Sequence, residues 1–220
     1  IADPDQELET EQESEPETEP EPEPEQVPEL KLESVENIAQ FVKDFNFCFL
    51  VPPFSNPDEI PDDTLLEIVI IWQKLFFLRV DRTIFTAAEV EVAAKAIFGP
   101  DLKDMEHQEL GLVWWDAALG EYEVRACQLG SWVETYIINT ETAKDHFLID
   151  VVHLKVVCDF SDEATSHETY DDNGHLLGKY TVDEVENIAQ ATLLKLPRRR
   201  YIFTVCADGS VNLAQSLKLQ

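Results

Sequence analysis

The chain has 220 residues, of which 44% are hydrophobic and 28% are charged, so it is long enough to bury a core of its own. Its 45 acidic residues outnumber its 16 basic residues and give a net charge of −29. A field of that sign repels phosphate groups, which excludes a nucleic-acid binder and disfavours binding to an anionic membrane surface. The composition predicts an acidic globular protein.

Residues 1–30 differ sharply in composition from the rest of the chain. They contain 13 acidic residues and no Lys or Arg, and six of the 12 prolines lie between Pro4 and Pro28. Charge repulsion and the fixed φ angles of proline favour an extended, solvated segment. We expect residues 1–30 to be a disordered acidic spacer, with a binding tail for a basic partner or cations as the alternative. Residues 31–220 are expected to form a single domain.

The beginning of the chain favours an exported protein. The chain begins at Ile1 and its single methionine is Met105, so we expect that an export signal has been removed; a sequence that begins inside a longer chain is the alternative. Residues 65–80 are the most apolar stretch, but they contain Glu67 and Lys74 and fall short of a membrane span. The expected location is extracytoplasmic, with the domain tethered to the membrane through the removed N-terminal anchor.

Two helices are predicted in the first third of the folded part. Ser34 precedes apolar residues at helical spacing, which indicates an amphipathic helix over residues 35–45. Residues 65–76 are apolar on nearly all sides, so a helix there must be central and buried. Thr64 and Glu67 have the spacing of a capping box and are predicted to begin this second helix.

A third helix has the clearest boundaries in the sequence. Thr86 and Glu89 again have the spacing of a capping box, and Phe85 and Val90 stand where a hydrophobic staple requires apolar residues. The pair Gly99-Pro100 supplies a stop. The sequence therefore predicts a helix from residue 87 to residue 98.

After residue 110 the apolar period changes to two, which predicts an antiparallel sheet. Asn173-Gly174 and Asp208-Gly209 are dipeptides of tight hairpin turns, and residues 181–195 fit either a short helix begun by Asp183 and Glu186 or a strand. The expected strands cover residues 112–115, 122–127, 132–139, 147–160, 201–206 and 211–219. The predicted fold class is α+β, with about three N-terminal helices packed on a curved antiparallel sheet.

Two segments carry a resemblance to a known group of proteins. They are the run FTAAEVEVAAKAIFG at residues 85–99 and the ending YIFTVCADGSVNL at residues 201–213. Together with the order of helices before a sheet, these segments resemble uncharacterised surface lipoproteins of gut Firmicutes. The resemblance covers residues 34–220 and implies a cleaved lipoprotein signal, an acidic spacer and an NTF2-like or cystatin-like α+β domain. The lipobox cysteine of such proteins is absent from this sequence, and no functional residue follows from the likeness.

Three residues of the predicted sheet are candidates for a binding site. Trp132 and Tyr136 belong to an aromatic cluster with Trp114 and Trp115, and one face of a curved sheet is suited to line a cavity beneath the second helix. His153 lies inside an apolar strand and is the only histidine placed to meet such a pocket. The alternative for all three is packing within the core, with His153 hydrogen-bonded at the sheet face.

No cofactor or metal site is predicted. The histidines lack the spacing of a metal pair, and no Cys-x-x-Cys pair is present. Thr169, Asp171, Asn173 and Gly174 resemble the start of a calcium loop but lack its first and last carboxylates, so a hairpin tip is expected. The four cysteines are expected to be free thiols, with one bridge between neighbouring strands as the alternative. These are Cys48, Cys127, Cys158 and Cys206.

The arginine run Arg198-Arg199-Arg200 is the only basic cluster in the acidic chain. Its position directly before a predicted strand favours two roles, the pairing of local carboxylates and the protection of a sheet edge. An anion site is the remaining alternative.

These observations favour a non-enzymatic, extracytoplasmic binding or interaction module of unknown ligand. Its partner would be a small molecule, a peptide or an envelope protein. One alternative is an enzyme on an NTF2-like scaffold, in which an acidic residue and His153 perform acid–base chemistry on a small molecule. Another is an acidic decoy or inhibitor that occupies a basic partner by charge mimicry.

Overall fold

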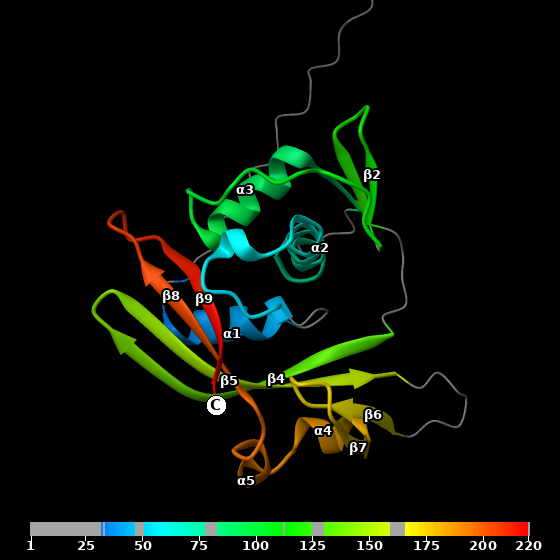
Figure 1. The fold of residues 1–220 in the computed structure, drawn as a ribbon, viewed down its shortest axis with the longest axis vertical. Helices are drawn as coiled ribbons and strands as arrows, with labels where there is room; N and C mark the ends of the chain where they lie inside the picture. The colour runs from blue at the N-terminus through cyan, green and yellow to red at the C-terminus, as the bar shows by residue number, and fades with distance from the viewer. Residues whose placement is uncertain are drawn as a thin grey trace, which may run out of the picture.

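The computed structural model describes residues 32, 34–46, 51–77, 83–111, 113–124, 130–158 and 166–219. The spacer predicted for residues 1–30 lies outside these residues, as do Cys48 and Cys127. The described part of the chain is mixed α+β, with antiparallel strand pairing throughout (Figure 1). The helices are α1 (Val35–Asn46), α2 (Asp62–Trp72), α3 (Ala87–Phe98), α4 (Val182–Glu186) and α5 (Gln190–Leu193), with a 3₁₀-helix η1 (Pro57–Glu59) and a π-helix η2 (Gln73–Phe77). The strands are β1 (Ile84–Thr86), β2 (Val113–Asp116), β3 (Glu121–Val124), β4 (Ser131–Ala143), β5 (His146–Val157), β6 (His167–Tyr170), β7 (Leu176–Tyr180), β8 (Arg198–Val205) and β9 (Val211–Leu219).

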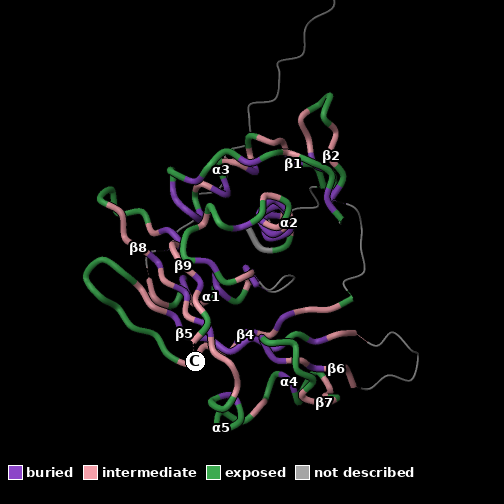
Figure 2. Tube along the Cα trace, viewed as in Figure 1, coloured by how far each residue is buried: buried purple, intermediate pink, exposed green. Residues whose placement is uncertain are grey.

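Helix α2 is the centre of the molecule. Its residues from Leu65 to Trp72 are buried apart from Glu67. The helix lies between α1 and α3 in Figure 1, and Figure 2 shows most of it in purple. The capping box predicted at Thr64 and Glu67 is wrong. The helix begins one turn earlier, at Asp62, because Pro61 presets the backbone and carboxylates in the first turn are favoured by the helix dipole.

The boundaries predicted for α1 and α3 are confirmed. Ser34 Oγ accepts a hydrogen bond from the Asn37 backbone N–H at 3.2 Å, as expected of a residue that begins a helix. At α3, Thr86 and Glu89 form both bonds of the capping box, and Gly99, with φ of 106°, ends the helix. Local hydrogen bonds of this kind depend on spacing along the chain, which is why the sequence predicts them.

The strands form two sheets, where the sequence predicted one. A small sheet has the order β1-β3-β2, and a large sheet contains the strands β4 to β9. Strands β2 and β3 of the small sheet overlap the regions where strands 112–115 and 122–127 were predicted. Strand β3 lies in the middle and pairs with β2 on one side and with β1 on the other. Strand β1 has three residues directly before α3 and is too short to show a period of two.

The large sheet divides along strand β5. Strand β4 pairs with one edge of β5 from His146 to Val157, while β8 and β6 share the opposite edge. The ladder with β8 ends at Val151, and the ladder with β6 begins at Lys155. His153 lies between these two ladders, at a position that we call the fork of the sheet.

The two faces of the large sheet have separate hydrophobic clusters. The main core contains α1, α2, α3 and the inner face of the small sheet, together with Ile149, Val151, Tyr201 and Phe203 of the large sheet. A smaller cluster on the opposite face joins Val152 and Leu154 to α5. In Figure 1, α1 and α2 accordingly lie above the large sheet, and α4 and α5 lie below it. None of the described helices is long and apolar enough to cross a membrane.

Candidate functional site

The three residues predicted for the binding site do not meet on one face of the sheet. Thr135 of β4 pairs with His153, and Tyr136 pairs with Val152, so His153 and Tyr136 point to opposite faces. Trp132 shares the face of Tyr136 by the same alternation. His153 therefore faces the main core, while Trp132 and Tyr136 face α4 and lie away from α2.

His153 is part of a buried hydrogen-bonded chain. Its Nδ1 lies 3.0 Å from Thr135 Oγ1 and its Nε2 lies 3.0 Å from the Tyr201 hydroxyl, which itself donates to Asn46 Oδ1 at 2.9 Å. Because Tyr201 donates to Asn46, it accepts from His153, which assigns the ring proton to Nε2. Burial, and next the charge of Arg199, lower the pKa of His153 well below its usual value. The ring is neutral and, at 1% exposure, it is closed to any ligand in solvent.

The arginine run pairs with carboxylates, as predicted. Arg199 binds both oxygens of Asp172, at 3.2 Å and 2.5 Å, and also donates to the Val51 carbonyl. Arg200 binds both oxygens of Asp150, at 2.6 Å and 2.9 Å. The predicted protection of a sheet edge is wrong, because β8 lies between β5 and β9. The Arg199–Asp172 pair is fully buried and ties the β6–β7 hairpin to β8 beside the fork.

The loop that resembles a calcium site is a hairpin tip, as expected. Asp171 accepts hydrogen bonds from the backbone N–H groups of Asn173 and His175 and pairs with the His175 ring, and Gly174 has φ of 80°. These bonds to Asp171 hold the pKa of its carboxyl below the usual value. Across the residues that the structure describes, no group of three or more potential ligands is arranged to hold a metal ion.

The two described cysteines, Cys158 and Cys206, are free. Cys158 follows the end of β5, whereas Cys206 follows the end of β8, which pairs with the beginning of β5. The antiparallel arrangement thus places them at opposite ends of the sheet, and the bridge considered between neighbouring strands is geometrically wrong.

The open side of the large sheet carries the pair α4 and α5. Thr181 and Glu184 form a complete capping box at the start of α4, which replaces the predicted start at Asp183 and Glu186. Asn187 ends α4, with its side chain donating to the Asp183 carbonyl at 2.8 Å. Ala189 is extended, so the chain turns before α5 begins. The region predicted as either one helix or a strand is therefore two short helices with a bend between them.

Strand β4 anchors α4 through Tyr136. The Tyr136 hydroxyl donates to the Val185 carbonyl, and the Val185 side chain is buried. Half-buried Glu134 lies nearby on the same face, and its pKa is raised by burial and next by the negative charge of Glu186. Burial likewise raises the pKa of Tyr136. Trp132 contributes an edge-to-face contact with His167 at 5.5 Å. Tyr136 thus supports α4 from beneath, whereas Trp132 contacts β6.

Replacing Tyr136 by phenylalanine should lower the free energy of unfolding by about 1 kcal/mol, because the bond to the Val185 carbonyl is lost while the ring stays packed. Urea denaturation followed by far-UV circular dichroism measures the change. Tyr180→Phe is the matched control, because the structure gives the Tyr180 hydroxyl no hydrogen bond within the described residues, and it should change stability by less than about 0.5 kcal/mol. Equal effects in the two variants would contradict the anchoring role of Tyr136.

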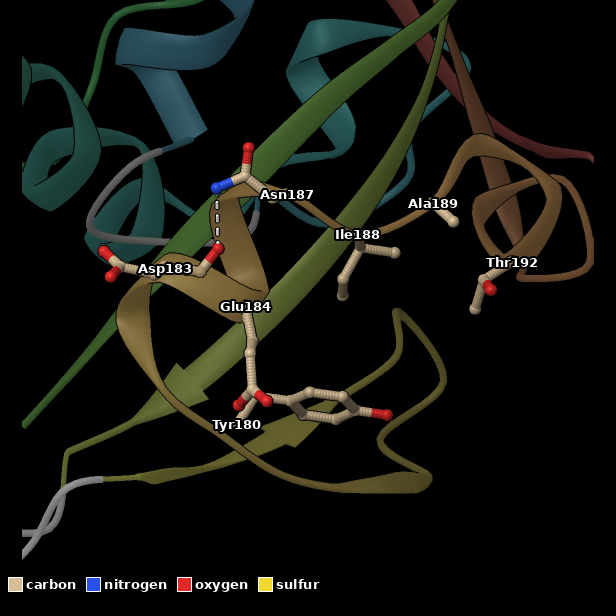
Figure 3. Close-up of a pocket in the computed structure, with 7 residues that line it drawn as sticks. All are labelled: Tyr180, Asp183, Glu184, Asn187, Ile188, Ala189 and Thr192. Carbon is tan, nitrogen blue, oxygen red and sulfur yellow. Dashed lines mark hydrogen bonds between the residues drawn. The ribbon is translucent and has the colours of Figure 1, made fainter.

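A pocket of about 420 Å³ opens beside this helix pair (Figure 3). In the close-up, Asp183 and Glu184 extend from α4, Tyr180 lies at the end of β7, and Thr192 projects from α5 on the opposite side of the view. Glu184 is held in the capping box, whereas the exposed Asp183 carboxylate is available for a ligand. The lining consists of Tyr180, Asp183, Glu184, Asn187, Ile188, Ala189 and Thr192.

The lining of this pocket combines apolar and acidic side chains. Tyr180, Ile188 and Ala189 offer apolar surface, and Asp183 offers a negative charge at the rim. Three of the seven lining residues, Tyr180, Asp183 and Glu184, carry groups that can exchange a proton, and Glu184 is held in the capping box. The sequence analysis missed these residues, although the spacing of Thr181 and Glu184 is a capping-box signal that predicts where α4 begins.

The predicted site residues therefore do not line the observed pocket. Tyr136 donates to α4, which forms one wall of the pocket, and His153 is hydrogen-bonded to Tyr201 at the fork of the sheet. Comparison with protein-family models, with curated proteins and with solved structures finds no match to this chain, so its function is inferred from the pocket itself.

Proposed function

We propose that residues 31–220 form a non-enzymatic binding module whose ligand site is the pocket between β7, α4 and α5. The pocket of about 420 Å³ carries this proposal, because its volume lies within the range of about 300–1,000 Å³ that is typical of small-molecule sites. Its lining is apolar with a carboxylate at the rim, which suits a small molecule or a peptide end that joins an apolar group to a positive charge.

The electrostatics of the chain support a cationic ligand. The net charge of −29 attracts cations from a distance, and Asp183 supplies a fixed negative charge where such a ligand would dock. Acid–base catalysis centred on His153 has less support, because the ring is 1% exposed, already hydrogen-bonded at both nitrogens and on the opposite face of the sheet.

The location and fold family belong to the same proposal. A module that binds small ligands at a cell surface is consistent with the acidic, proline-rich composition of residues 1–30 and with the resemblance to surface lipoproteins. An NTF2-like or cystatin-like assignment is supported by the packing of α1 on β4 of an antiparallel sheet. On this proposal the domain is held outside the cytoplasm by a lipid anchor upstream of the spacer.

The proposal predicts selective binding of a simple aromatic amine. Phenethylamine should shift the backbone amide resonances of residues 180–192 in a ¹H–¹⁵N NMR titration, whereas 3-phenylpropionate, which has the opposite charge, should not. Asp183→Asn should weaken phenethylamine binding about threefold, the effect of one exposed ion pair. Ala189→Trp should abolish it by filling the pocket.

Glu186→Gln is the matched control, because it removes the same charge from the same helix at a residue outside the lining. It should leave the phenethylamine affinity unchanged. Shifts that survive Ala189→Trp would show that the pocket is not the binding site. If the protein chemically converted a bound amine and Asp183→Asn abolished that conversion, the protein would be an enzyme and the proposal of a non-enzymatic module would be wrong.

A further inference from the structure

A second surface of the molecule has the character of a docking site. The small sheet packs one face against the main core through Phe85, Tyr122 and Trp115, which form one row of paired residues across β1, β3 and β2. The neighbouring rows must therefore point away from the core. This outer face lies at the end of the molecule opposite α4 and α5 (Figure 1), so it is separate from the pocket already described.

The outer face combines apolar side chains with carboxylates. Ile84, Glu123 and Trp114 form one row across the three strands, and the next row on the same face contains Glu121 and Asp116. Ile84 is 44% exposed and Trp114 is 46% exposed. Two large apolar side chains, each nearly half exposed, thus flank an exposed glutamate, and apolar surface rimmed by polar residues is typical of interaction sites.

A small depression lies within this face. Its volume is about 110 Å³, and its walls include Ile84, Trp114, Leu119, Glu121 and Glu123. That volume is well below the range of about 300–1,000 Å³ for small-molecule sites, so it suits one side chain rather than a whole ligand. Leu119, at 69% exposure, extends the apolar rim at the β2–β3 turn. The depression therefore points to a side chain presented by another polypeptide.

The charges of the face define which side chain fits. Within the described part of the chain, no Lys, Arg or His lies within ion-pair distance of Glu121, Glu123 or Asp116. A cation entering the depression would meet these carboxylates and the face or edge of the Trp114 ring, and a cation over an indole is stabilised by the ring quadrupole. Its aliphatic stem would cover Ile84 or Leu119, as the stems of long basic side chains do on apolar surface.

We propose that the outer face of the small sheet docks an extended basic segment of a partner protein, with a lysine or arginine side chain in the depression beside Trp114 and Glu123. The segment combines basic and apolar residues, because Glu123 lies between Ile84 and Trp114 in one row and the next row adds the carboxylates of Glu121 and Asp116. The negative field of the chain steers such a partner to the surface.

Two peptides without charged ends, titrated into the full chain in a calorimeter, test the proposal. One peptide alternates lysine and leucine, and the other carries glutamate at every lysine position. The lysine peptide should bind, and its affinity should fall as salt is raised from 0.15 M to 0.5 M. Trp114→Ala should weaken binding about tenfold, Trp114→Phe should weaken it less, and Glu123→Gln should weaken it about threefold.

Glu141→Gln is the matched control, because it removes the same charge from an exposed position of β4 at the far hairpin of the large sheet. It should bind the lysine peptide as the unchanged protein does. Equal affinities for Trp114→Ala and Glu141→Gln would overturn the proposal, because they would assign all binding to diffuse charge, including that of residues 1–30. Equal binding of the glutamate peptide would overturn it as well. A dimer seen by analytical ultracentrifugation and lost in Trp114→Ala would show that a second copy of the chain covers this face instead.

Discussion

Replacing Arg199 by methionine should lower the free energy of unfolding by about 3–5 kcal/mol, because it leaves the Asp172 carboxylate buried without its partner. Both side chains of this pair are at most 2% exposed, and Arg199 supplies two of its bonds to the carboxylate and a third to the Val51 carbonyl. Urea denaturation of the purified chain measures the loss as a lower transition midpoint.

Two further variants separate the lost ion pair from lost packing. The double variant Arg199→Met with Asp172→Leu removes the isolated charge and should recover at least about 2 kcal/mol relative to Arg199→Met alone. Arg198→Met changes the adjacent arginine, which is half-buried, and should cost less than about 1 kcal/mol. If the double variant were as unstable as the single variant, the loss would come from packing and not from the charge.

The stability of the chain should also depend on pH through His153. Its pKa in the folded state lies well below its usual value, because the ring is buried beside Arg199, whereas in the unfolded state it lies near the ordinary value of about 6.5. Below pH 6.5 the unfolded state therefore binds a proton that the folded state does not. This contribution to stability is fully present above pH 6.5 and falls by about 1.4 kcal/mol per pH unit as the solution is acidified toward the folded-state pKa.

His153→Gln keeps a hydrogen-bonding side chain but removes the group that titrates. The many carboxylates are the same in both proteins, so the difference between their slopes of unfolding free energy against pH comes from His153. Denaturant midpoints at pH 7, 6 and 5 should fall less steeply in His153→Gln. His146→Gln replaces an exposed histidine of the same strand and should keep the full slope. Parallel slopes for His153→Gln and the unchanged protein would show that His153 takes up its proton equally in the folded and unfolded states, which would contradict a lowered pKa in the folded state.

Much of the fold was predictable because its signals are local. Thr86 with Glu89 and Ser34 with Asn37 form bonds between residues three apart, and these helix starts are confirmed. The turn at Asp208-Gly209 is confirmed for the same reason, since Gly209 adopts φ of 88° between β8 and β9. The predicted start of α2 was wrong because two competing helix-start signals, Pro61 and Thr64, lie within one turn of each other.

The site was less predictable because it depends on which residues share a face. Alternation along a strand shows that Tyr136 and Thr135 point in opposite directions, but it does not show which direction faces the larger core. His153 was expected beside Tyr136, and the pairing with Thr135 places it on the other face. The pocket depends on the bend at Ala189, which carries no strong turn signal in the sequence.

The fork in the large sheet has a consequence for how this protein can evolve. Strand β5 ends at Val157, and β8 begins at Arg198 on the edge of β5 that β6 also uses, so the pairing of β5, β8 and β9 does not depend on β6, β7, α4 or α5. The pocket is built from β7, α4 and α5, so its residues can change without altering the pairing of β5, β8 and β9. Asp172 is the exception, because it neutralises Arg199 of the core. In related chains Asp172 and Arg199 should therefore be kept or lost together. A chain that lacks the segment between β5 and β8 should carry an apolar residue in place of Arg199.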